Sequence, residues 1–120
     1  DKLKAQISQL TSQAQSGGAN FDKAYASADR AVNSAGRASV SSDAWVAAQV
    51  AISAAESARN DSVSALASLD TLFIERSNAV ADGSEKGGVA DIDAARASVL
   101  SMVDSQNDRI DALKNRLPQP

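Results

Sequence analysis

The chain has 120 residues, a size typical of one domain, and its net charge of −3 argues against a basic face for nucleic acid or anionic lipid. The lack of cysteine and histidine excludes disulfides, thiolate catalysis and nearly all zinc or copper sites. Hydrophobic residues make up 43% of the chain, but 25 residues are alanine and only 3% of the chain is aromatic. This composition favours an elongated helical bundle over a compact globule, because alanine favours helix and lets helices approach closely.

Residues 2–35 carry an apolar pattern whose spacing alternates between four and three positions. Its members are Leu3, Ile7, Leu10, Ala14, Gly17, Phe21, Ala24, Ala28, Ala31 and Ala35. The phase continues unchanged through Gly17 and Gly18, so it predicts one helix with a weak point there, each glycine costing about 1 kcal/mol relative to alanine. The alternative is two shorter helices, the second capped by Asn20.

The stretch from Gly36 to Ser42 predicts a loop, because a glycine directly after a periodic segment suits the left-handed end of a helix. Ser42 is a suitable N-cap, and Asp43 is favourable in the first turn that follows. Residues 43–82 form the second predicted helix. Its apolar residues, which include Trp45, spread over a wider face than in the first segment, as expected for a helix with two neighbours.

A second glycine-rich stretch, residues 83–88, predicts another loop, with Gly88 as the cap of a third helix over residues 89–117 that Pro118 ends. The third segment has a coiled-coil pattern formed by Ile92, Arg96, Val99, Val103, Gln106, Ile110, Leu113 and Leu117. Short loops make successive helices antiparallel. The sequence therefore predicts an all-α, elongated antiparallel three-helix bundle, up-down-up with coiled-coil-like packing, as a single domain over residues 1–120.

Counting outward from each loop places Gly17 near Ser62, Arg96 near Glu75 and Leu117 near Ala54. The third helix is then expected to stop short of the end that carries Trp45. An uncovered apolar end indicates an interface, and tryptophan is a common hot-spot residue. The candidate interface residues are Trp45, Ala28, Ala31, Val32, Ala48 and Ile52.

Two alternatives remain at this end. Trp45 instead folds over Ala31 and Val32 and closes the bundle, or the tail after Leu117 covers part of the surface. If the interface exists, Trp45→Ala is expected to weaken association without unfolding the bundle.

Asp104, Asp108 and Asp111 lie on one helix face, where a carboxylate cluster suits Ca²⁺ or acid–base chemistry. A straight helix adds no loop carbonyls, however, so a solvated face is the preferred interpretation. The loop around Lys86 lacks the Gly-Lys-Ser/Thr ending that cradles phosphate. No catalytic, metal or cofactor-binding residue is predicted, and we expect no enzyme.

The expected function is therefore a non-enzymatic structural or protein-interaction module that binds a protein partner or another copy of itself, with no nucleic acid and no membrane insertion. The alternative is a small-ligand-binding helical bundle of the bacterial cell envelope, with a cavity near Gly17, Ala58 and Ser62. The chain begins at Asp1 without an initiator methionine and is rich in serine and alanine without cysteine, which leads us to expect export to the periplasm or the outside. No motif is specific enough to indicate a family.

Overall fold

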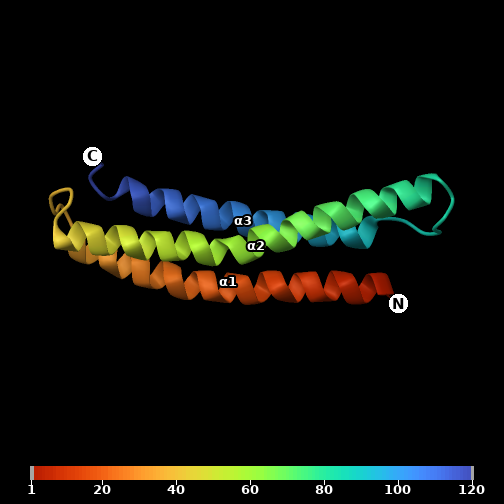
Figure 1. Ribbon diagram of the computed structural model, residues 1–120, viewed down its shortest axis with the longest axis horizontal. Helices are drawn as coiled ribbons and strands as arrows, with labels where there is room; N and C mark the ends of the chain where they lie inside the picture. The colour runs from red at the N-terminus through yellow and green to blue at the C-terminus, as the bar shows by residue number, and fades with distance from the viewer. Residues whose placement is uncertain (1, 120) are drawn as a thin grey trace.

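The computed structural model describes residues 2–119, and these residues form three helices and no strand. The helices are α1 (Lys2–Ala35), α2 (Asp43–Ala81) and α3 (Ala90–Asn115). They run up, down and up along a rod of 62 × 22 × 15 Å (Figure 1). The prediction of an elongated three-helix bundle is confirmed.

Helix α1 is continuous through Gly17 and Gly18, as its unbroken apolar phase predicts. Gly17 is buried against α2, where a methyl group in place of its hydrogen would lie 2.7 Å from the Cβ of Asp61 and 3.3 Å from the backbone nitrogen of Ser62. The glycine therefore lets the two helices approach closely. Direct packing of α1 on α2 leaves no room at Gly17 itself, and a ligand cavity near Gly17, Ala58 and Ser62 stays a prediction.

The first loop forms as predicted. Gly36 ends α1 with a φ of +54°, and the Ser42 hydroxyl accepts a hydrogen bond from the backbone nitrogen of Trp45 at 3.3 Å. The second loop differs by one residue, because Val89 rather than Gly88 precedes α3. The Val89 carbonyl accepts the first helical bond, from Asp93 at 2.9 Å, and no side chain caps this end.

The core consists of two apolar clusters on either side of a polar layer. Within that layer Gln106 donates to the Ser62 hydroxyl at 3.1 Å, and this hydroxyl lies 3.6 Å from the sulfur of Met102. The cluster nearer the first loop includes Phe21, Ala28, Val32, Ala35, Ala48, Ile52, Ala55, Ile110, Leu113 and Leu117. The other cluster includes Ala14, Ala65, Leu69, Val99 and Val103. Gln106 thus occupies the seam position that its spacing predicts.

Helix α3 lies closer to the first loop than counting from the second loop predicts. Arg96 pairs with Asp70 at 2.7 Å rather than lying level with Glu75. The reason is that the second loop folds back along α2: Arg76 pairs with Glu85 at 3.0 Å and donates to the carbonyl of Lys86 at 2.7 Å. Helix α3 therefore starts beside α2 instead of beyond its end.

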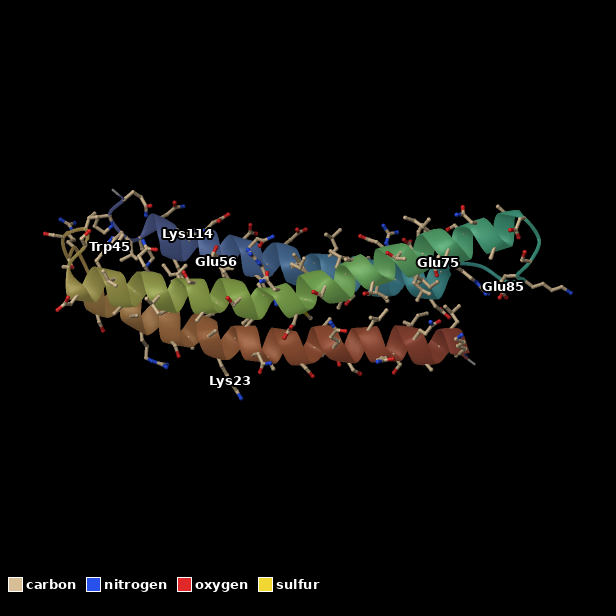
Figure 2. All side chains as sticks on the ribbon, viewed as in Figure 1. Lys23, Trp45, Glu56, Glu75, Glu85 and Lys114 are labelled. Atoms are coloured by element: carbon tan, nitrogen blue, oxygen red, sulfur yellow. The ribbon has the colours of Figure 1, made fainter. Side chains whose placement is uncertain are left out.

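This displacement carries the C-terminal tail across the end that was expected to be uncovered. Leu117 is 4% exposed within the core, and the indole N–H of Trp45 donates to the carbonyl of Pro118 at 2.8 Å. The prediction of a bare end is therefore wrong, and the alternative that the tail covers part of this surface is the one that the structure supports. We call this end the closed end, defined by Trp45, which is labelled in Figure 2, together with Leu117 and Pro118.

Candidate functional site

The structure brings the predicted interface residues together, but it covers most of them. Ala28, Val32, Ala48 and Ile52 are buried in one cluster with Leu113 and Leu117. Ala31 and Trp45 are half-buried and pack against the same cluster. A partner therefore has access only to what Ala31 and Trp45 leave exposed, and the interface at this end stays a prediction.

The opposite end of the molecule is open. In Figure 1, α2 diverges from α1 toward the N-terminus of α1. There Leu3, Leu10 and Leu72 remain half-buried although their spacing places them on the helix seams, and Ile74 is 59% exposed. Large apolar side chains are thus less covered here than alanines are at the closed end.

Two adjoining grooves lie between α1 and α2 at this end. The first has a volume of about 280 Å³ and is lined by Gln6, Gln9, Leu10, Ser68, Thr71, Leu72 and Glu75. The second has a volume of about 350 Å³ and is lined by Lys2, Leu3, Gln6, Leu72, Glu75, Arg76, Ala79 and Glu85. Because they share Gln6, Leu72 and Glu75, we treat them as one site, the open-end groove.

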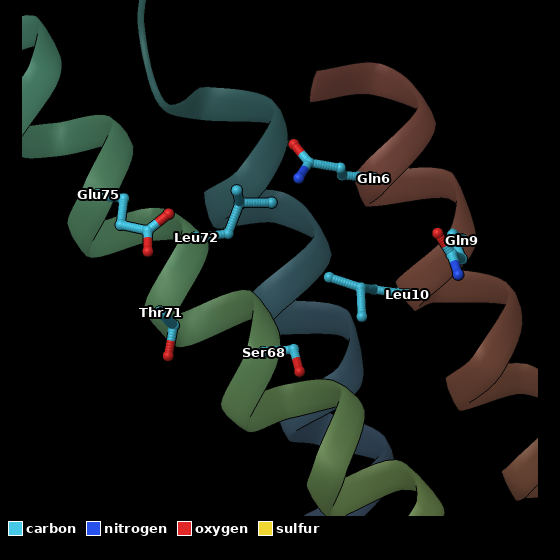
Figure 3. Close-up of a pocket in the computed structure, with 7 residues that line it drawn as sticks. All are labelled: Gln6, Gln9, Leu10, Ser68, Thr71, Leu72 and Glu75. Atoms are coloured by element: carbon cyan, nitrogen blue, oxygen red, sulfur yellow. The ribbon is translucent and has the colours of Figure 1, made fainter. Parts of the chain in front are cut away.

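Figure 3 shows how the groove is built. Leu10 of α1 and Leu72 of α2 project toward one another across the space between the helices, and Gln6 and Ser68 lie on either side of them. Apolar side chains thus form the middle, and two amides, two hydroxyls and the Glu75 carboxylate form the rim. This arrangement of an apolar floor and a polar rim is typical of surfaces that bind another helix.

The charged side of the groove is fixed by the second loop. Arg76 is held by Glu85 and by the carbonyl of Lys86, so its guanidinium is positioned rather than free. Next to it, the Ser84 hydroxyl and backbone N–H both bond to the Asp82 carboxylate and lower the pKa of that exposed group. The loop therefore has internal order even though residues 81–88 are exposed.

The groove stays open because α3 is bound to α1 mainly in the other half of the molecule. Arg109 pairs with Asp22 at 3.1 Å and its guanidinium lies 4.7 Å above the ring of Phe21, and Arg116 pairs with Asp29 at 2.6 Å. Among the described residues no α3 ion pair reaches the part of α1 before Asp22. In the part of the chain that the structure describes, ion pairs with α3 and the residue after it therefore hold only the second half of α1.

Sequence reasoning missed this groove, because Leu3, Leu10 and Leu72 carry the pattern of ordinary core residues. The three aspartates Asp104, Asp108 and Asp111 are exposed, and residues 2–119 contain no group of three side chains placed to hold a metal ion. None of the three helices, over the residues described, has a stretch apolar and long enough to cross a membrane. No protein-family model, no curated protein and no solved structure matches the chain.

Proposed function

We propose that the chain is a non-enzymatic protein-interaction module and that the open-end groove binds one amphipathic helix of a partner protein. The observation that supports this function is the incomplete burial of Leu3, Leu10 and Leu72 along one groove. Covering these side chains is favourable, because burial of apolar surface contributes about 25 cal/mol per Å².

The dimensions of the groove suit a short helix. On α2 it extends from Ser68 to Ala79, which corresponds to about 16 Å at a rise of about 1.5 Å per residue, or three helical turns. Three turns present two or three apolar side chains on one face, enough to fill the spaces beside Leu10 and Leu72. Gln6 and Gln9 at the rim supply hydrogen-bond donors and acceptors for the polar side of such a helix.

The test is a selection from a displayed library of short amphipathic helical peptides against the whole chain, followed by NMR mapping of the peptides that bind. We expect shifts at Leu3, Leu10 and Leu72, and we expect Leu72→Gln to weaken binding at least tenfold. Leu100→Gln is the matched control, because Leu100 is 48% exposed on α3, away from the groove. Shifts confined to the surroundings of Trp45, or no binding peptide at all, would contradict the proposal.

A small apolar ligand is the second candidate occupant, because the two parts of the groove, at about 280 and 350 Å³, lie close to the lower limit of common ligand sites, about 300 Å³. A thermal-shift screen with single-chain lipids and aromatic acids tests it. Stabilisation that rises with ligand concentration and is lost in Leu72→Gln favours this candidate. Unchanged melting across the panel removes it and leaves the helix as the occupant.

A further inference from the structure

The charged side chains that form no ion pair within the bundle differ in sign between α1 and α3. Among the described residues of α1 the unpaired charged side chains are all basic, because Asp22 pairs with Arg109 of α3 and Asp29 pairs with Arg116, the residue that follows α3. These unpaired basic residues are Lys2, Lys4, Lys23 and Arg30. On α3 every basic residue is paired and the unpaired charges are all acidic: Asp91, Asp104, Asp108 and Asp111.

The two sets match in spacing. Lys23 and Arg30 are seven positions apart, and so are Asp104 and Asp111. Seven residues are about two turns, so each pair lies on one side of its helix with about 10 Å between its members. Asp108 adds a third carboxylate on the same face of α3.

Both faces are outward and flanked by small side chains. Lys23 extends away from α2 and α3 (Figure 2), and Asp104 and Asp111 are exposed. Around the basic pair lie Ala26 and Ser27, and around the acidic pair lie Ser101, Ser105 and Ala112. Small residues let two helices approach closely enough for the charged side chains to meet across the contact.

Among the described residues these groups form no ion pair within their own molecule for a geometric reason, and Arg30 makes only a hydrogen bond, to the Ser27 hydroxyl at 3.2 Å. The pairs Arg109–Asp22 and Arg116–Asp29 occupy the contact between α1 and α3, and Lys23 and Asp104 lie outside it. These internal pairs also neutralise the carboxylates next to Lys23 and Arg30. The outer face of α1 is therefore basic on balance, and the outer face of α3 is acidic.

We propose that this protein associates with itself through these faces: α1 of one copy packs along α3 of a second copy, with Lys23 and Arg30 facing Asp104 and Asp111. The contact joins two different surfaces, so the pair keeps one free basic face on one copy and one free acidic face on the other, and further copies can add. Among the described residues, none of these four lines the open-end groove. Self-association can therefore be tested independently of partner binding in the open-end groove.

The test uses two charge-reversed variants. Variant A carries Lys23→Glu and Arg30→Glu and is acidic on both faces, and variant B carries Asp104→Lys and Asp111→Lys and is basic on both faces. Sedimentation at low ionic strength should show the unaltered chain gaining mass with concentration. Each variant alone should associate at least tenfold more weakly, and an equimolar mixture of A and B should associate at least as strongly as the unaltered chain.

The mixture is the decisive measurement, because loss of association in a single variant can also follow from a folding defect. Circular dichroism of A and B checks that both remain helical. Lys4→Glu with Lys86→Glu changes the net charge as much as variant A at exposed positions outside the groove and should leave association unchanged. An unaltered chain that stays monomeric at low salt, or a mixture of A and B that does not associate, overturns the proposal.

Discussion

The two ends of this bundle are built from the same heptad pattern and differ in how well they are closed. At the closed end, alanines such as Ala28 and Ala48 are fully buried, whereas at the open end Leu3 and Leu10 are only half-buried. If side-chain size alone decided burial, the leucines would be more buried than the alanines. The difference teaches that burial in a long bundle depends on where the third helix lies, and that the apolar pattern of one helix does not determine it.

Polar contacts explain the difference in closure. At the closed end, α3 and its tail make three polar contacts with the other helices. They are the hydrogen bond of Trp45 with Pro118 and the ion pairs of Lys114 with Glu56 and of Arg116 with Asp29. At the open end the Arg96–Asp70 pair joins α3 to α2 and leaves α1 out. Exposed ion pairs contribute only about 0–1 kcal/mol each, so their role is mainly to fix which helices meet.

The largest expected effect comes from removing the same side chain at both ends. Leu113→Ala should destabilise the chain by about 2–5 kcal/mol, because Leu113 is fully buried and leaves a cavity. Leu10→Ala should cost about 1 kcal/mol, because water already reaches its side chain. Urea unfolding followed by circular dichroism measures both. Equal costs would contradict the distinction between a closed and an open end.

The adjacent glycines near the middle of α1 should respond with opposite signs. Gly17→Ala gains about 1 kcal/mol of helix propensity but forces a methyl group against Asp61, and overpacking of this kind costs about 1–3 kcal/mol. The net effect should be destabilising. The methyl group of Gly18→Ala would meet only the flexible end of Met102, its sulfur at 3.2 Å and its Cε at 3.6 Å, so the substitution should stabilise by up to about 1 kcal/mol. Thermal melts of the two variants give the signs directly.

The fold was predictable because each helix carries its own signal in a regular spacing. The unbroken phase through Gly17 and the seam position of Gln106 both correspond to the structure. The axial position of α3 was not predictable, because it depends on Arg76 folding the second loop back along α2. That contact involves no periodic residue. Because the axial position of α3 was predicted wrongly, the uncovered apolar surface was expected at the wrong end and the groove beside Leu72 was not predicted.

The closed end depends partly on a single hydrogen bond, which Trp45→Phe removes while keeping an aromatic ring. The Pro118 carbonyl then loses its donor, and we expect a cost of about 1 kcal/mol. The effect should be local, with faster hydrogen exchange in the last turn of α3 and unchanged exchange in the first turns of α1. Faster exchange at both ends would show that the two ends unfold as one unit.

The smallest expected effect is at the open end, in the second loop. Bonds from the Ser84 hydroxyl and backbone N–H lower the pKa of Asp82, with the hydroxyl as the larger cause. Since the folded pKa lies below the unfolded one, these bonds stabilise the fold above the unfolded pKa, and this contribution is lost as the pH falls through the folded value. An NMR titration of the Asp82 carboxyl should show the lowered midpoint. Ser84→Ala should remove most of this lowering of the pKa, and the bond from the backbone N–H should maintain the rest. A midpoint unchanged by Ser84→Ala would mean that the hydroxyl does not order this loop, and that the contacts of Arg76 with Glu85 and the Lys86 carbonyl hold the loop against α2 without its help.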